Sequence, residues 1–235
     1  MKFRRGSKNI STPVVVALGG SIMYPDQINW AYLRRFKKFI GDFVKHGQVF
    51  VIVGGGGRLA RMYQGAAAKV VKLTDEDKDW LGIHATRSNA HLLRTIFREI
   101  ADPVVIDERF KLKRITYPIT IASGWRPGWS TDFIAVRLAA DLNAKEVVIA
   151  GTPSHVFDKD FTKYKDAVPF TDLSWAKYRR LIPAKWKPGF HSPVDPVAAR
   201  LAEQERISAA VLDGRDLKNF GRFLRGESFI GTTIR

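Results

Sequence analysis

The sequence predicts an α/β fold, a three-layer α/β/α sandwich in which helices cover both faces of a mostly parallel sheet. Three observations lead to this prediction: apolar runs of strand length, helical spacing in the segment after each run, and a glycine-containing break between the two. The runs are almost continuously apolar, which is typical of parallel strands buried on both faces. They span residues 13–18, 49–53, 118–123, 146–150 and 209–212.

The helices are predicted from the spacing of their apolar residues. The first, residues 28–46, carries apolar residues on one stripe and most of its basic residues elsewhere. The stripe consists of Leu33, Phe36, Ile40 and Phe43. Similar spacing recurs at 58–71, 76–101, 131–143, 172–181, 196–206 and 216–225. Because no internal repeat or proline-rich linker is visible, one domain over 1–235 is predicted, with lobes at about 1–144 and 145–235.

Composition predicts a soluble protein that attracts anions. Hydrophobic residues make up 45% of the chain, and the absence of cysteine excludes disulfides and thiolate chemistry. The basic start lacks the apolar stretch of a secretory signal, and no run reaches the length of a membrane span, which predicts a cytoplasmic location without a membrane partner. A formal charge of +16, spread along the chain, predicts that nucleic acid binds only non-specifically through the basic surface.

Four predicted strand ends carry glycines or other small residues where the chain leaves the sheet. Their sequences are "LGGSIM", "VGGGGRLAR", "ASGWRPGWSTD" and "AGTPSHVFDKD". Bare backbone lets amide N–H groups approach phosphate oxygens, and a helix that starts there adds its positive end, so these breaks indicate anion binding. Tight turns that need a left-handed residue are the alternative explanation for one or two of the glycines.

Other common chemistries lack their motifs. The Walker pattern needs a lysine followed by serine or threonine after its glycines, and the dinucleotide pattern needs spaced glycines; "GGGGRLAR" has neither. The serines of "GGSIM" and "GWSTD" do not form the strained elbow of a hydrolase. No metal site is predicted, because the histidines show no ligand-like spacing. They are His46, His84, His91, His155 and His191.

Five segments, in this order and spacing, resemble the UMP kinase (uridylate kinase) family of the amino acid kinase superfamily, in its archaeal type. They are "VALGGS", "VGGGGRLARMY", "DWLGIHATRSNAHLL", "GWRPGWSTDFIAV" and "SPVDPVAARLAE". The resemblance covers roughly residues 13–234, and "DWLGIHATRSNA" together with "RPGWSTD" is its most specific part. It implies an amino acid kinase-like fold, ATP and UMP as substrates, Mg²⁺ carried with ATP, and a hexamer.

The resemblance also implies roles on the acceptor side. The residues expected to face the transferring phosphoryl group are Gly19, Gly20 and Ser21, and we add Arg58 as a catalytic residue that supplies charge there. The expected UMP-binding residues are Gly55, Gly56, Gly57, Arg61, Asp79, Trp125, Ser130 and Thr131. Among these, Arg61 would reach the UMP phosphate and Asp79 the ribose hydroxyls. From the residues alone, Asp79 is equally a helix-surface carboxylate, and Asp132 equally a helix cap.

On the donor side, the resemblance implies a set of ATP-binding residues, Thr152, Phe157, Asp158, Lys159 and Asp160. Relatives read like "TNVDGVYDKDP" here, whereas this chain has "GTPSHVFDKDF". His155 replaces a glycine and thus puts a side chain where the family backbone can adopt unusual dihedrals. We therefore expect altered contacts with the donor nucleotide.

Two phosphate-neutralising lysines of the superfamily are replaced, by Ala17 and Ser192. We expect Arg58 to supply the missing charge, assisted by Lys159 or by Lys185 and Lys187, because an arginine keeps its charge and offers a planar fork of donors.

Two alternatives to a UMP kinase stay open at the level of the sequence. One is a phosphotransferase of the same superfamily with a different small-molecule acceptor. The other is a non-enzymatic nucleotide- or nucleic-acid-binding protein on the same fold, which the altered donor loop and the charge of +16 favour.

Overall fold

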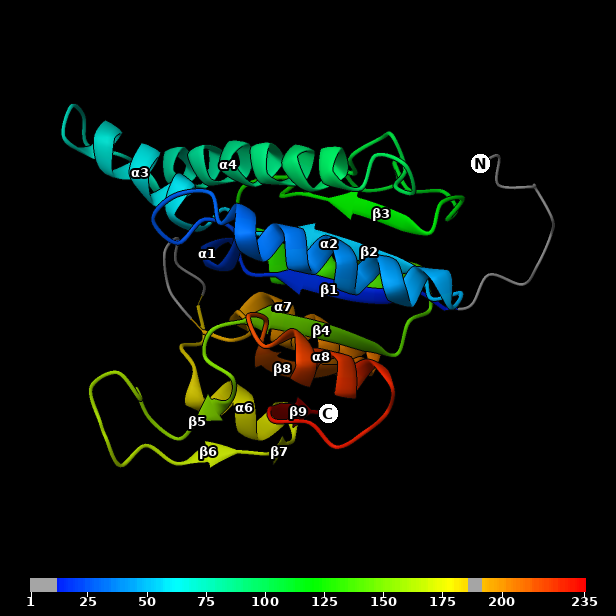
Figure 1. Ribbon diagram of the computed structural model, residues 1–235. Helices are drawn as coiled ribbons and strands as arrows, with labels where there is room; N and C mark the ends of the chain where they lie inside the picture. Colours follow the sequence, from blue (N-terminus) through cyan, green and yellow to red (C-terminus); the bar gives the residue numbers. More distant parts are fainter. Residues whose placement is uncertain (1–11, 186–191) are drawn as a thin grey trace.

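A seven-stranded sheet in the order β3-β2-β1-β4-β8-β9-β7 forms the centre of the computed structural model, which describes residues 12–185 and 192–235 (Figure 1). The strands are β1 (Val14–Leu18), β2 (Phe50–Gly54), β3 (Ile119–Ala122), β4 (Glu146–Gly151), β7 (Asp172–Leu173), β8 (Ser208–Asp213) and β9 (Thr232–Ile234). Two residues of the sequence-based predictions, Lys187 and His191, lie outside the described residues.

The five predicted strands are confirmed, and they pair in parallel. β1 lies between β2 and β4, so that Val15 is opposite both Val51 and Val147. β3 pairs with the outer side of β2, and β8 with the outer side of β4. Strands buried in this way need apolar residues toward both layers, which explains their continuous hydrophobic sequences.

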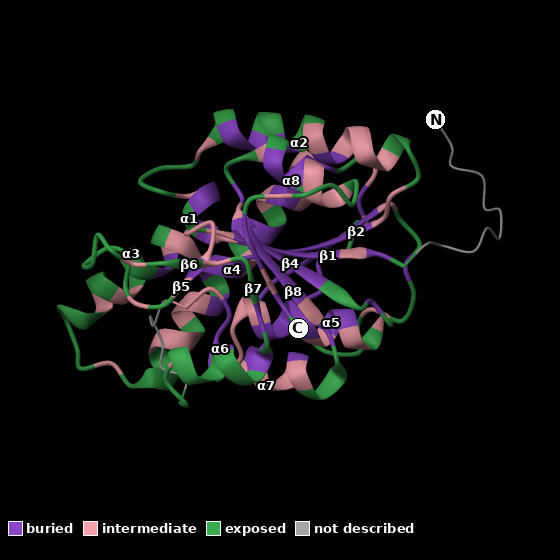
Figure 2. Ribbon diagram, turned by 90° about the horizontal axis from the view of Figure 1, so that it is seen from below, coloured by how far each residue is buried: buried purple, intermediate pink, exposed green. Residues whose placement is uncertain are grey.

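Successive strand residues face opposite sides of the sheet and so build two hydrophobic cores. In β1, Val15 belongs to one core and Val16 to the other. Three helices contribute to the first core, α5 (Thr131–Asp141), α6 (Trp175–Leu181) and α7 (Pro196–Glu205). The second core is completed by α2 (Trp30–Lys45), α4 (Asp75–Ile96) and α8 (Leu217–Leu224). Figure 2 shows α2 and α8 on one side of the strands and α5 and α7 on the other, which confirms the three-layer prediction.

Polar side chains determine where several helices start. At α4, Thr74 and Asp77 form a capping box, in which Thr74 Oγ1 accepts from the Asp77 N–H and Asp77 Oδ2 accepts from the Thr74 N–H. Asp195 caps α7, whose first residue, Pro196, needs no hydrogen-bond acceptor for its nitrogen. The end of α4 was predicted too late, since the helix stops at Ile96 rather than at residue 101.

The sequence missed the shortest elements. They are α1 (Gly20–Met23), β5 (Val156–Phe157), β6 (Pro169–Phe170), β7 and β9. The helix predicted at 172–181 begins only at Trp175, because Asp172 and Leu173 pair with β9 instead. Strands of two or three residues are too short to show a periodicity, and their positions follow from their partners in the sheet.

The parallel strands all end at one edge of the sheet, and this edge positions the site. There the chain leaves β1 through Gly19 into α1, and it leaves β2 through Gly55 and Gly56 into α3 (Gly57–Ala68). β4 ends beside them at Gly151, which is paired with Asp213 of β8. Ligands of open α/β sheets bind at such an edge.

Pairing within the sheet continues across the boundary expected between the two lobes. β1 precedes residue 145 and β4 follows it, yet the two strands are neighbours. The division into lobes at about 1–144 and 145–235 stays a prediction. None of the helices in the described residues combines the length and the apolar character needed to cross a lipid bilayer.

Candidate active site

A cavity of about 220 Å³ opens at the carboxyl edge of the sheet, where the ends of β1, β2 and β4 meet. Many residues singled out from the sequence line it. They are Gly19, Gly20, Ser21, Gly55, Gly56, Gly57, Arg61, Thr131 and Thr152. Segments separated by more than a hundred residues therefore contribute to one cavity.

The glycines of the two loops are needed first of all for backbone packing. A Cβ added at Gly20 would lie 2.2 Å from the nitrogen of Gly57 and 2.5 Å from the oxygen of Gly55. Conversely, a Cβ at Gly57 would lie 2.3 Å from the carbonyl carbon of Gly20, and Gly57 has a positive φ of 59°. The loops after β1 and β2 thus interlock through bare main chain, so the left-handed turn considered from the sequence exists at one position of the GGGG run.

The same loops also leave donors available beside the cavity. Neither α1 nor α3 has a side-chain cap, since Gly19 and Gly56 occupy the cap positions. An uncapped helix start has backbone N–H groups without intrahelical acceptors and carries a partial positive charge. The twelve-residue helix α3 starts at the cavity, and its first turns also supply Arg61. This edge suits a bound phosphate group.

Two buried residues of α4 hold the segments that follow β2 and β3, and the sequence analysis assigned them no function. Asn89 is only 4% exposed, and its side-chain amide donates to the carbonyls of Gly55 (2.8 Å) and Gly56 (3.2 Å). Thr86 accepts a hydrogen bond of 2.8 Å from the Gly124 N–H. Their places in "TRSNA" could have indicated this structural role, because polar residues on the inner face of a helix need hydrogen-bond partners.

The two arginines after the glycine loop have different surroundings. Arg61 lines the cavity. Arg58 instead forms an ion pair with Asp26, at 2.5 Å, and both side chains are well exposed. Exposed ion pairs contribute about 0–1 kcal/mol, so Arg58 can exchange this partner for another anion at little cost.

At the start of α5, the predicted UMP-binding residues border a carboxylate pair. Ser130 caps the helix by accepting from the Phe133 N–H at 3.0 Å, and its hydroxyl donates to the buried Asp195. The next residue but one, Asp132, lines the cavity. Burial raises the pKa of Asp132 well above its usual range, and the negative charge of Asp195 raises this pKa further. Asp132 is therefore a carboxyl group that resists ionisation beside the proposed phosphate site.

Asp79 and Trp125 make contacts within the protein and do not line the cavity. Asp79 accepts a hydrogen bond of 2.7 Å from the Gly128 N–H, which ties "DWLGI" to "RPGWSTD". Burial is the main cause that raises the pKa of Asp79, and the bond from Gly128 opposes it. Trp125 is 5% exposed and donates from Nε1 to the carbonyl of Ile106 at 3.2 Å.

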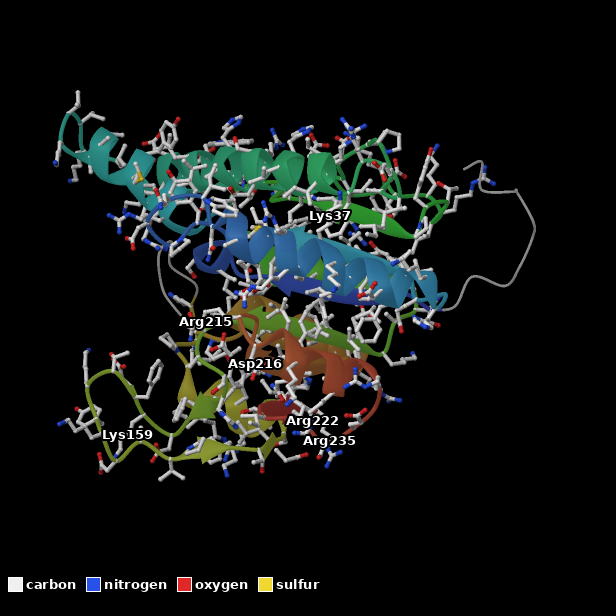
Figure 3. All side chains as sticks on the ribbon, in the orientation of Figure 1. Lys37, Lys159, Arg215, Asp216, Arg222 and Arg235 are labelled. Atoms are coloured by element: carbon white, nitrogen blue, oxygen red, sulfur yellow. The ribbon has the colours of Figure 1, made fainter. Side chains whose placement is uncertain are left out.

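Most of the predicted ATP-binding residues lie along β5 and the segment that follows it, and they have local partners. Phe157 stacks on Phe161 with ring centroids 5.0 Å apart. Asp158 accepts from the Val168 N–H, Asp160 accepts from the Thr162 N–H, and Lys159 pairs with Asp166 at 2.6 Å. Figure 3 shows Lys159 on the loop between β5 and β6, apart from the ends of β1 and β2. Of the predicted set, only Thr152 lines the cavity.

His155, which replaces a glycine of the family pattern, does not have a left-handed backbone conformation. In the described part of the chain, the non-glycine residues with positive φ are Phe110, Asn143 and Arg206. His155 Nδ1 lies 2.9 Å from Ser154 Oγ, and burial lowers the pKa of the imidazole. Ala17 and Ser192, which stand where the superfamily has lysines, both line the cavity. Among the described residues of the lining, Arg61 is the one lysine or arginine.

The sequence pattern described as the amino acid kinase family matches residues 12–110 and 118–213 of this chain. The chain belongs to the amino acid kinase family. The uridylate kinase of Methanothrix thermoacetophila is 34% identical to this chain, in an alignment that covers 94% of this chain and 99% of the relative. The uridylate kinase of Hyperthermus butylicus is 31% identical, in an alignment that covers 94% of this chain and 97% of the relative. The crystal structure of uridylate kinase from Archaeoglobus fulgidus has a TM-score of 0.81 at 28% identity and covers 95% of this chain and 100% of its own.

Because the loops after β1 and β2 interlock in this member of the amino acid kinase family, adding one methyl group at a glycine of these loops should lower the stability of the protein. Gly20→Ala should destabilise the protein by about 3 kcal/mol, because the new Cβ meets backbone that cannot move aside. Gly65→Ala is the matched control in α3; no atom lies within 4 Å of its Cβ, so a gain of about 0.5–1 kcal/mol is expected. Urea denaturation measures both, and equal stability of the two variants would contradict the interlock.

The raised pKa of Asp132 predicts a pH-dependent stability. The folded carboxyl group holds its proton more tightly than the unfolded one, so stability falls as pH rises from the unfolded pKa through the folded pKa. Asp132→Asn removes this loss, and its melting temperature relative to the parent protein should therefore increase between pH 5 and pH 8. Asp166→Asn, at an exposed ion pair, is the control. A melting-temperature difference for Asp132→Asn that does not change with pH would refute the assignment.

Proposed function

We propose that this chain is a UMP kinase, which transfers the γ-phosphoryl group of ATP to UMP and produces UDP and ADP. The observation that carries the proposal is the single cavity in which the glycine loops after β1 and β2, Arg61 and the end of β4 come together. Membership of the amino acid kinase family and the names of the similar uridylate kinases support this activity over other uses of the cavity.

On the acceptor side, we assign the UMP phosphate to the backbone of Gly55, Gly56 and Gly57 and to Arg61. Backbone donors and a planar guanidinium suit the non-bridging oxygens of a phosphate. Asp79 would accept hydrogen bonds from the ribose hydroxyls, in addition to the one that it accepts from the Gly128 N–H. We assign an indirect role to Trp125, because its ring lies in the core.

The start of α5 would border the same nucleotide. Thr131 lines the cavity and can donate to the phosphate, whereas Ser130 caps the helix and is bonded to Asp195. For Ser130 we therefore propose that it orients the first turn of α5. Gly19, which follows β1, and Gly20 and Ser21, the first residues of α1, line the cavity and would surround the transferring group.

On the donor side, ATP would enter along Thr152 toward Phe157, Asp158, Lys159 and Asp160, with Mg²⁺ bound to its phosphates as part of the substrate. An oxygen of the UMP phosphate attacks the γ-phosphorus, and the bond from this phosphorus to the β–γ bridging oxygen breaks as ADP leaves. Such a transfer needs alignment and charge neutralisation but no covalent enzyme intermediate. Arg61 is the one lysine or arginine among the described cavity residues, so the other donors there are main-chain amides and hydroxyl groups.

We further propose that the enzyme works in the cytoplasm in pyrimidine nucleotide biosynthesis and assembles as a hexamer. The assembly can be tested separately from the activity, by light scattering of the purified protein.

The activity is tested by ADP formation with ATP, Mg²⁺ and UMP. We expect turnover that depends on UMP, together with a rise in melting temperature on adding UMP. CMP and isopentenyl phosphate serve as alternative acceptors. Stabilisation by one of these instead of UMP would indicate a different phosphotransferase, and nucleotide binding without ADP formation would indicate a non-enzymatic protein.

The two arginines of α3 predict separable kinetic defects. Arg61→Ala should raise KM for UMP by about tenfold or more, because a charge-assisted contact with the phosphate is lost. Arg58→Ala should lower kcat by orders of magnitude with the fold intact, if Arg58 leaves Asp26 to neutralise the transferring group. Steady-state kinetics with each substrate varied separates the two effects. Near-normal turnover of Arg58→Ala would remove Arg58 from the mechanism.

A further inference from the structure

A second surface of interest lies on α2 and α8, whose residues do not line the cavity. The two helices pack side by side, with the rings of Phe39 and Phe220 5.2 Å apart. Gly221 lies beside Phe39 at this crossing, since a Cβ built on it would lie 3.4 Å from the Phe39 ring, at van der Waals distance. We call residues 30–45 and 213–227 the α2–α8 face. Figure 3 shows Lys37 on α2 and Arg222 on α8, both on the face turned toward the viewer.

This face carries a concentrated positive charge. It contains nine lysines and arginines against four aspartates and glutamates, a net charge of +5. Every carboxylate has a partner within the face. Asp42 pairs with Lys45, Asp213 with Arg215, Glu227 with Arg225, and Asp216 caps α8. The acidic residues are therefore already used, and what remains on the surface is positive.

Five cations of the α2–α8 face are exposed and form no ion pair with any described residue. They are Arg34, Arg35, Lys37, Lys38 and Lys218. Arg34 and Lys38 are one helical turn apart, a spacing at which like charges repel each other. An external polyanion would relieve this repulsion and would release the counterions it brings.

An aromatic side chain adds a second kind of contact to the charge. Trp30, the first residue of α2, is 64% exposed, and the guanidinium of Arg34 lies 5.1 Å from its ring. An exposed ring backed by an arginine is a platform on which a base can stack. Trp30 is also the one large apolar side chain on the described parts of α2 and α8 that is strongly exposed. A bilayer-binding helix needs a broader apolar face, so these observations favour nucleic acid over a lipid surface.

We propose that the α2–α8 face binds single-stranded nucleic acid, with phosphates along the unpaired cations and a base stacked on Trp30. The proposal concerns a surface outside the cavity, so it stands whether or not the chain is a UMP kinase. It also assigns the general affinity for nucleic acid, expected from the charge of +16, to a defined part of the molecule.

The test uses the full chain and a fluorescently labelled single-stranded oligothymidylate of 20 nucleotides, with anisotropy as the readout. Affinity should fall with rising salt, with a logarithmic slope of about −3 for four or five phosphate contacts. Lys37→Glu combined with Lys38→Glu should weaken binding by at least about tenfold at fixed salt. Trp30→Ala should weaken binding with little change in the salt slope, because stacking releases no counterions.

The matched control combines Lys113→Glu with Lys165→Glu, at two exposed lysines away from the face. Both double variants change the net charge equally, so the control should weaken binding less than about threefold if the face is the site. A melting temperature or a UMP-dependent ADP formation equal to that of the parent protein shows that each variant is folded. Equal loss in both double variants would overturn the proposal. The proposal would also be overturned if duplex DNA bound as tightly as the single strand and Trp30→Ala had no effect. Binding to phosphatidylserine vesicles without binding to the oligonucleotide would overturn it as well.

Discussion

The close contact between the loops that follow β1 and β2 is the constraint on which the site depends. Gly20, Gly55 and Gly57 meet through main-chain atoms at distances that leave no room for a Cβ. This contact sets the starts of α1 and α3, and with them the uncapped amides and Arg61 at the cavity. Packing and anion binding are therefore two consequences of the same bare backbone, and the glycines serve both.

The helix α4 connects this contact to the rest of the proposed acceptor side. Asn89 donates hydrogen bonds to the carbonyls of Gly55 and Gly56. Thr86 accepts one from the Gly124 N–H, and Asp79 accepts one from the Gly128 N–H. All of these residues lie on one long helix, so the loop after β2 and the turn before α5 are placed by a single element.

Charge is distributed unevenly between the cavity and the outer surface. The described cavity lining contains Arg61 as its one lysine or arginine, and it also contains Asp132, whose pKa burial raises. The α2–α8 face, by contrast, carries a net charge of +5. In the proposed reaction, Arg61, Arg58 after its release from Asp26, main-chain amides and Mg²⁺ delivered with ATP neutralise the phosphates, whereas the basic residues of the α2–α8 face lie outside the cavity.

The sequence by itself determined the five parallel strands, their covering helices and the glycine loops of the cavity, because continuous apolar runs and helical spacing are local patterns. It did not reveal that β9 runs antiparallel to β8, or that Asp172 and Leu173 form a strand, since such short elements depend on their partners. Only the tertiary structure decided that Gly20 meets Gly57, that Asn89 holds Gly55, and that Arg58 turns to Asp26 while Arg61 reaches the cavity. These contacts join residues distant in the chain, and the physical reason is that packing between loops, rather than local preference, selects them.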